Sequence, residues 1–310
     1  MTLSIEREPQ TVRDAPPARV ITAKVTLLQR LGEIWAAREL LVAMVRKELK
    51  IKYKDSALGF VWSMLNPAMY LVIFYLVFSV FLGNGIPLFP IWLLSGLLVW
   101  NLFSSVLPSA TGAVVGNASL IKKVSFPREV LPLASVGAGL VHFCLQSSVL
   151  LAGLLVFQHG INPAFFAIVP FALLVLVVLT SALAIFLSAV NVYVRDSQHL
   201  LELALLAWFW MTPIIYPFRF VGDKLVANGL PQWVFMLNPL TPIVMTFQRA
   251  IYNTTTAKDI NGGAPIKMLP DVGVAYHALA LGILLTASTV FLVLAMRLFR
   301  RLEGNFAEEL

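Results

Sequence analysis

The sequence predicts an all-α integral membrane protein with six transmembrane helices per subunit, an N-terminal amphipathic interface helix, and two short outward-side re-entrant helices between spans five and six. Of the 310 residues, 59% are hydrophobic and only 13% are charged, whereas soluble domains average about 45–50% apolar and about 25% charged residues. Residues 56–121 and 130–194 contain no Asp, Glu, Lys or Arg. The composition excludes a soluble globular protein, and the single cysteine, Cys144, excludes a disulfide scaffold.

The chain begins with a segment that we expect to be a flexible cytoplasmic N-terminus, residues 1–32. It contains several prolines and charges but no continuous apolar core, so it does not resemble a cleavable signal peptide. Residues 33–55 follow as an amphipathic helix, because apolar side chains recur there at helical spacing. Its basic residues, which could contact lipid headgroups, are Arg46, Lys47, Lys50, Lys52 and Lys54. This helix is either a membrane-surface anchor or a platform for a cytoplasmic partner.

Each charge-free stretch is long enough for two membrane crossings, since one crossing needs about 20 apolar residues. Turn-forming residues divide the first stretch at 83–87 and the second at 159–163. Residues 200–216 predict a fifth span and residues 272–296 a sixth. The six-span domain therefore covers residues 56–297, and residues 298–310 form a cytoplasmic tail.

The distribution of Lys and Arg predicts the orientation in the membrane. Eighteen of the 23 basic residues lie in residues 1–57, the connections after spans two and four, and the tail, whereas five lie in the connection after span five. Because Lys and Arg concentrate in cytoplasmic loops, both termini are expected in the cytoplasm. The basic net charge of +7 then reflects topology, and we expect no nucleic-acid partner.

The connection between spans two and three predicts a short cytoplasmic helix at about 117–128. Ser119 could cap this helix, and Pro127 could bend or end it. The mixture of apolar and basic side chains is typical of a docking surface, although a positive loop resting on lipid has the same charge. The candidate docking residues are Ser119, Leu120, Ile121, Lys122, Lys123, Val124 and Phe126.

The extracytoplasmic connection 217–271 is too long to be an ordinary structureless loop. Its apolar pieces, 230–237 and 243–252, are too short to span a membrane. They predict two re-entrant or interfacial helices, with an ordinary extracytoplasmic cap as the alternative.

Aromatic residues are regularly spaced in spans one and five. Four of them lie on multiples of four residues and hence on one helix face. They are either packing and interface residues or the lining of a channel in which aromatic rings stack on sugars. The candidates are Trp62, Tyr70, Phe74 and Phe78 in span one, and Trp208, Trp210 and Tyr216 in span five.

Few ionisable residues lie in or beside the spans, and such residues are functional candidates. His142 is expected near mid-depth, either in an interhelical hydrogen bond or as a proton relay. Glu202 lies near the cytoplasmic end of span five, and Arg195 and Asp196 could form a local pair or an inner gate. The chain has no phosphate-binding loop, metal-ligand spacing or nucleophile elbow. Energy for uphill transport would have to come from another polypeptide.

Several segments together resemble the permease subunits of type-2 ABC transporters that export polysaccharides such as O-antigen, teichoic acid or galactan. The resemblance covers residues 30–310 in order. It is carried by RELLVAMVRKELKIKYKDSALGFVWSMLNP at 38–67, VSFPREVLPL at 124–133, NVYVRDSQHLL at 191–201, TPIIYP at 212–217, LNPLTPIV at 237–244 and FAEEL at 306–310.

The resemblance implies a homodimer in the cytoplasmic membrane of a bacterium, with a channel at the dimer interface for a lipid-linked glycan. Two cytoplasmic ATPase subunits would bind ATP and Mg²⁺, so this chain would hold no cofactor, catalytic residue or metal. Residues 33–55 match the family's interface helix and 117–128 its coupling helix. The alternatives are a type-2 exporter of a drug or lipid, and a membrane enzyme acting on lipid-linked sugars with His142 as catalyst.

Overall fold

The computed structural model describes residues 27–54, 61–81, 83, 86–253, 256–257 and 266–310. Apart from a two-residue antiparallel ladder between β1 (Thr256–Ala257) and β2 (Ile266–Lys267), all regular structure in these residues is helical. The long helices are α2 (Arg38–Tyr53), α3 (Trp62–Phe74), α4 (Phe89–Gly116), α6 (Val130–Val156), α8 (Val169–Tyr193), α9 (Ser197–Met211) and α12 (Val274–Glu303). The short ones are α1 (Leu27–Ala36), η2 (Tyr75–Phe81), α5 (Ala118–Ile121), α7 (Pro163–Phe166), α10 (Phe218–Ala227), η3 (Gln232–Leu237), α11 (Leu240–Ile251) and α13 (Phe306–Glu309).

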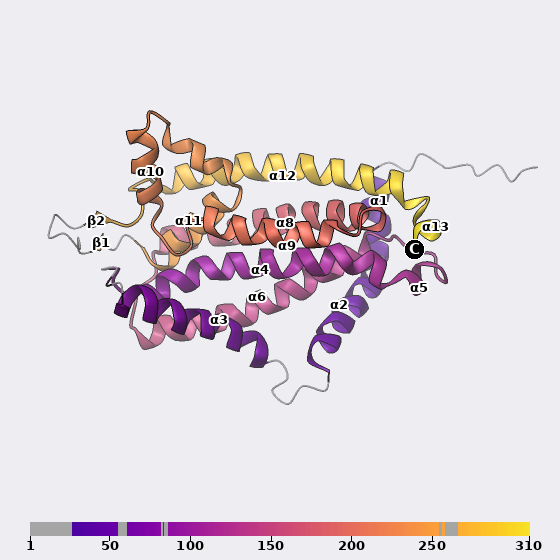
Figure 1. The fold of residues 1–310 in the computed structure, drawn as a ribbon, viewed down its shortest axis with the longest axis horizontal. Coiled ribbons are helices and arrows are strands. Elements are labelled where there is room, and N and C mark those ends of the chain that lie inside the picture. The colour runs from indigo at the N-terminus through magenta and orange to yellow at the C-terminus, as the bar shows by residue number, and fades with distance from the viewer. Residues whose placement is uncertain (1–26, 55–60, 82, 84–85, 254–255, 258–265) are drawn as a thin grey trace, which may run out of the picture.

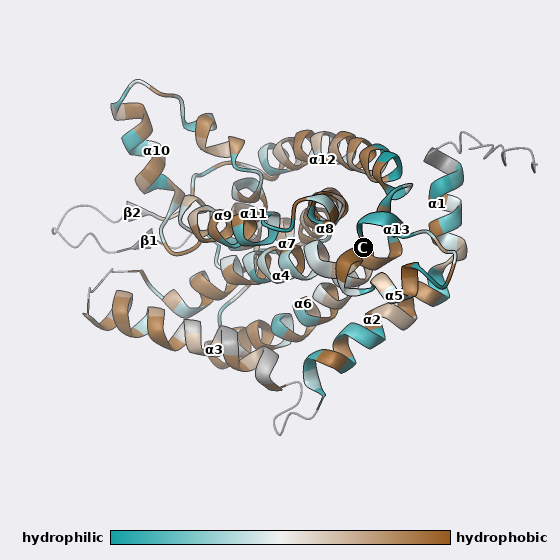
Figure 2. Ribbon diagram, turned by 45° about the vertical axis from the view of Figure 1, so that its right-hand side comes forward, coloured by the Kyte–Doolittle hydropathy of each residue, from teal (hydrophilic) through white to brown (hydrophobic). Residues whose placement is uncertain are grey.

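Helices α4, α6, α8, α9 and α12 run side by side along the longest axis of the molecule, whereas α2 crosses that axis at a steep angle (Figure 1). Within the described residues, four helical segments are long and apolar enough to cross a membrane: 89–116, 130–156, 163–193 and 274–303. Most of α4 is buried, with Trp92 and Phe103 fully enclosed, whereas much of α12 is exposed. Helix α4 is therefore the centre of the bundle. Helix α12 is rich in hydrophobic residues (Figure 2), and its Leu279, Ile283, Val290 and Leu294 are exposed, as a lipid environment requires.

The two ends of the bundle differ in structure (Figure 1). One end, which we call the α5 end, carries α1, α5, α13 and the C-terminus. The other, the α10 end, carries α10, β1 and β2. Clustered charges lie at the α5 end, where Arg300 and Arg301 occupy the last turn of α12.

The expected helix 33–55 is two helices in the structure. Helix α1 begins at Leu27, earlier than predicted, and the chain bends at Ala37 before α2 begins. The predicted helix at 117–128 is also wrong in length, because α5 ends at Ile121. Ser119 lies inside α5, and Asn117 is the residue that precedes it.

Two of the six predicted spans, the first and the fifth, correspond to helices that are shorter than the four apolar segments named above. The first corresponds to α3 and η2, which are continuous from Trp62 to Phe81. The fifth corresponds to α9, which ends at Met211 rather than at residue 216. Thr212 is extended there (φ −104°, ψ 134°), because a residue before proline disfavours the helical conformation.

The long connection after α9 folds into three short helices, one more than predicted. The apolar pieces 230–237 and 243–252 correspond to η3 and α11, whereas α10 was not anticipated. Every residue of α11 is buried, and its Phe247 packs against Phe143 of α6. Helix α11 is part of the core rather than a surface cap.

Candidate functional site

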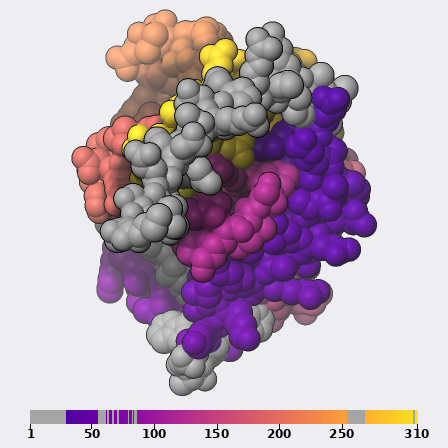
Figure 3. Space-filling model, turned by 90° about the vertical axis from the view of Figure 1, so that its right-hand side faces the viewer, coloured from indigo at the N-terminus to yellow at the C-terminus, as the bar shows by residue number. Residues whose placement is uncertain are grey.

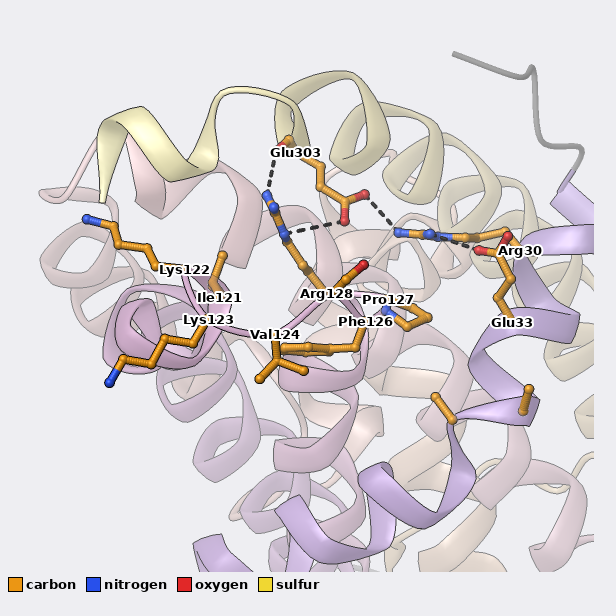
Figure 4. A pocket seen from close by; sticks show the side chains of 13 residues that line it. Arg30, Glu33, Ile121, Lys122, Lys123, Val124, Phe126, Pro127, Arg128 and Glu303 are labelled. Atoms are coloured by element: carbon orange, nitrogen blue, oxygen red, sulfur yellow. Dashed lines mark hydrogen bonds and ion pairs between the residues drawn. The ribbon is translucent and has the colours of Figure 1, made fainter. Parts of the chain in front are cut away.

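An open groove of about 870 Å³ lies at the α5 end of the bundle. Its walls come from α1, from the chain between α5 and α6, and from the last residue of α12 (Figure 4). Figure 3 views this end of the molecule, where the indigo surface of α1 and α2 lies beside the magenta surface of the chain near α5. The groove thus joins three segments that are far apart in the sequence.

An ionic network fixes one wall of this groove. Arg30 of α1 donates from Nε and Nη2 to the two carboxylate oxygens of Glu129, at 2.8 and 2.7 Å. The same guanidinium lies 2.8 Å from Glu303 and 2.9 Å from Glu33. Arg128 contacts Glu303 as well, donating to its backbone oxygen at 2.6 Å. In Figure 4, Arg30 and Arg128 both point toward Glu303.

The electrostatics of Arg30 favour its charged form. Burial alone would lower the pKa of this guanidinium, but the hydrogen bond and charge of Glu129, together with the charge of Glu303, raise it above its ordinary value. The Glu129 side chain is completely buried, and Arg30 bonds both of its carboxylate oxygens. A buried carboxylate with a two-point partner is expensive to leave unpaired, and the network therefore holds α1 to the chain that enters α6.

The predicted docking residues separate into an anchored set and an exposed set. Ile121 is buried in a core cluster with Phe299 and Phe306, and Leu120 and Phe126 pack against that cluster. The side chains that remain exposed are Ser119, Lys122, Lys123 and Val124. Figure 4 shows Lys122 and Lys123 pointing away from the ionic network. The structure therefore presents two ammonium groups and one apolar side chain on a rigid base.

Helix α2 is attached to the bundle beside this groove. Its Lys47 Nζ donates to Asn117 Oδ1 at 2.6 Å, directly before α5. Two residues before Lys47, Val45 lies so close to Gly137 of α6 that a methyl group added to Gly137 would be 2.6 Å from Val45 Cγ2. The tight glycine contact and the hydrogen bond tie α2 to both α5 and α6.

His142 of α6 contacts the C-terminal end of α2. The hydroxyl of Tyr53 lies 3.0 Å from His142 Nδ1, and Lys52 Nζ lies 3.4 Å from Nε2. His142 is thus an interhelical hydrogen-bonding residue, as one of the two sequence interpretations held. All five basic candidates of this segment are exposed, including Lys52 beside His142: Arg46, Lys47, Lys50, Lys52 and Lys54.

The aromatic candidates whose side chains the structure describes contact different parts of the chain. Phe74 stacks on Phe209 of α9 with ring centroids 6.5 Å apart, and Phe78 packs against Phe89 at 6.0 Å. Trp208 donates from Nε1 to Asn238 at 2.9 Å. Tyr216 donates to the backbone oxygen of Trp210, and Trp210 itself is exposed. The side chains of Trp62 and Tyr70 lie outside the described residues.

The ionisable candidates at the start of α9 are on the surface. Arg195 and Asp196 are both exposed, and no ion pair joins these two described side chains. Glu202 instead lies 3.9 Å from His199. Within the described part of the chain, no group of three or more His, Cys, Asp or Glu residues could hold a metal ion.

Three residues of the site were missed by sequence reasoning. Arg30, Glu129 and Glu303 were not singled out, because the pairs they form are 99 and 273 residues apart. The only sequence feature that marks these three residues is that they are charged and flank apolar helices. Many membrane proteins have charged residues in such positions.

Comparisons with known proteins give matches over most of the chain. A family model described as ABC-2 type transporter matches residues 39–252. The chain is similar to an O-antigen export system permease protein RfbA of Myxococcus xanthus, with 33% identity over 73% of this chain and 85% of the relative. A protein of the same name from Klebsiella pneumoniae is 28% identical over 87% and 94%. The polysialic acid transport protein KpsM of Escherichia coli is 25% identical over 67% and 80%.

Proposed function

The chain belongs to the ABC-2 type transporter family, and we propose that it is the membrane-spanning permease of an ATP-driven polysaccharide exporter. Its relatives named as O-antigen and polysialic acid transport permeases are matched over most of their length. The family is that of a transporter's membrane subunit rather than of an enzyme, and the four apolar helices make the chain a multi-pass membrane protein. The cargo we propose is a lipid-linked glycan of the O-antigen, galactan or teichoic-acid type.

The observation that carries this proposal is the groove at the α5 end. Lys122, Lys123 and Val124 are exposed on a base that Ile121 and the Arg30–Glu129 pair hold in place. Such a surface suits a soluble protein partner with a complementary acidic and apolar patch. The partner that we propose is a cytoplasmic ABC ATPase, two copies of which would bind ATP and Mg²⁺ beneath a permease dimer.

The topology we propose completes six spans with the two shorter helices. The continuous α3–η2 segment, residues 62–81, is about 30 Å long at 1.5 Å per residue, which matches the hydrocarbon core. Helix α9 is shorter, at 15 residues. In this arrangement both termini are cytoplasmic, and α11 would re-enter from the outer side.

A dimer interface along α9 would place the channel between two copies. Leu200, Leu203, Leu206 and Trp210 are exposed at helical spacing on α9, which gives it a face for either lipid or a second copy. Trp210 and Tyr216 would then contribute to the channel lining, together with the span-one aromatics. Arg195 and Asp196, exposed between α8 and α9, would lie at its inner mouth.

The basic face of α2 would contact the negative charge of the inner leaflet. Arg46, Lys47, Lys50 and Lys54 are exposed there, and each basic residue near an anionic surface contributes about 1 kcal/mol of attraction. We propose that this face draws the diphosphate of the lipid-linked glycan toward the channel.

The proposal is tested by export from cells that lack the native gene. Wild-type protein should restore surface glycan and co-purify with an ATPase, whereas Lys122→Glu/Lys123→Glu should lose both while still inserting into the membrane. Lys224→Glu, at the α10 end, is the matched control and should behave as wild type. Restored export with no ATPase bound would contradict the proposal.

A further inference from the structure

A second pocket, of about 380 Å³, lies between α2, α4 and α6 and is not used by the docking surface. Each of the three helices contributes both apolar and polar residues to its lining, which is unusually polar for a space between helices of a membrane protein. The polar lining residues are Glu48, Lys52, Ser105, Ser109, Ser135 and His142.

Two opposite charges face this pocket without neutralising each other. Glu48 accepts a hydrogen bond from Ser135 Oγ at 2.8 Å and a longer one from Ser109 Oγ at 3.5 Å. Lys52 Nζ lies 3.4 Å from His142 Nε2. No ion pair joins Glu48 to Lys52 among the described side chains.

Neither side chain has an ion-pair partner among the described residues that would offset the cost of burying its charge. Burial raises the pKa of Glu48, although the Ser135 and Ser109 hydroxyls work against this. Burial also lowers the pKa of Lys52, with the charge of Glu48 opposing it. A ligand that brings one positive and one negative group would therefore stabilise both side chains in their charged forms.

The level of the pocket in the membrane points to a lipid headgroup. Lys50 and Lys54 are exposed on the same end of α2, and exposed ammonium groups avoid the hydrocarbon core. This end of α2 therefore lies within reach of the headgroup layer, and the pocket that Lys52 and His142 line is beside it.

We propose that this pocket binds the headgroup of a phospholipid whose zwitterion carries a primary ammonium, of the phosphatidylethanolamine class. The ammonium donates to the Glu48 carboxylate, and the phosphate lies against Lys52 and His142. Side chains four residues apart on a helix have Cβ atoms about 5–6 Å apart, and a two-carbon linker separates the two charges of the headgroup by a similar length.

The lining discriminates against two other headgroups. A choline lipid carries a quaternary ammonium without N–H groups, so it cannot donate to Glu48. An anionic headgroup or a diphosphate brings more negative charge close to the Glu48 carboxylate, and like charges at short range are unfavourable. This site is separate from the transported cargo, and it would stand if the cargo were a different molecule.

Native mass spectrometry of the full chain tests the proposal. The protein is purified in detergent and titrated with dioleoyl lipids carrying ethanolamine, choline or glycerol headgroups. We expect the ethanolamine lipid to bind about tenfold more tightly than the choline lipid, the change expected for hydrogen bonds to one charged group. Equal affinities for these two, or tighter binding of the phosphatidylglycerol, would overturn it.

Variants separate the pocket from the rest of α2. Glu48→Gln should abolish the preference for ethanolamine over choline, and Glu39→Gln, the same change at an exposed position in the first turn of α2, should leave it intact. Ser135→Ala is a milder change for the case in which Glu48→Gln does not fold, and it should reduce the preference. A preference unchanged in Glu48→Gln and Ser135→Ala would overturn the site, and displacement of the lipid by millimolar soluble phosphoethanolamine would overturn a lipid as its occupant.

Discussion

Replacing Glu129 by glutamine removes the central charge of the network at the α5 end. The carboxylate is fully buried and takes two hydrogen bonds from Arg30, at 2.8 and 2.7 Å. Glutamine keeps one acceptor oxygen, but its NH₂ group faces a donor of the guanidinium. A hydrogen bond to a charged group contributes about 1.5–3 kcal/mol, and Arg30 retains Glu303 and Glu33. We therefore expect a loss of about 2–3 kcal/mol in the free energy of unfolding, or roughly 30- to 150-fold in the equilibrium constant.

The assay for Glu129→Gln is equilibrium unfolding in mixed micelles, with Glu33→Gln as the matched control. Glu33 bonds the same arginine at 2.9 Å, but its side chain is 42% exposed, so its loss should cost less than about 0.5 kcal/mol. Equal effects of Glu129→Gln and Glu33→Gln would refute the reasoning.

Three further predictions concern the packing of α5 and α2 and the charge of Glu48. Ile121→Ala should destabilise the protein by about 2–4 kcal/mol because the side chain is buried, whereas exposed Val124→Ala should change stability little; thermal unfolding of the two variants compares them. Gly137→Val should separate α2 from α6, because even a methyl group would lie 2.6 Å from Val45; faster proteolysis within α2 than in Gly153→Ala, which has open space, reports it. Burial raises the pKa of Glu48 in the folded state, so folding favours its protonated form, and stability should fall as the pH rises from about the ordinary carboxyl pKa of 4.5. Glu48→Gln should remove that part of the pH profile, and a profile identical to wild type would contradict the assignment.

The long apolar helices could be predicted from the sequence because lipid imposes a simple rule on composition. The charge-free stretch 130–194 predicted α6 and α8 and the turn between them, and Gly160 and Pro163 fall at that turn as expected. The six-span count is less direct. Helix α9 stops at Met211, where Pro213 restricts the preceding residue.

The site itself could be predicted only in part. The exposed Lys122 and Lys123 followed from local sequence, because turns with adjacent charges lie on the surface. Helix α5 ends at Ile121, well before the predicted residue 128. Pro127 disfavours a helical conformation in the residue before it, and Phe126 packs against the core cluster, a long-range contact that no local pattern specifies. The pairing of Arg30 with Glu129 and Glu303 depends on how the bundle brings its two termini together. Single-sequence patterns carry no such long-range information.

Site-directed crosslinking to the ATPase tests the central claim most directly. Cys144 is exposed, so it is first changed to serine, and single cysteines are then introduced as Val124→Cys in the docking surface and Val226→Cys at the α10 end. Both positions are exposed to a similar degree. The account predicts that a short bismaleimide joins Val124→Cys, and not Val226→Cys, to the co-expressed ATPase, and that ATP changes the yield. Absence of crosslinking at position 124 in a complex that exports glycan would contradict it.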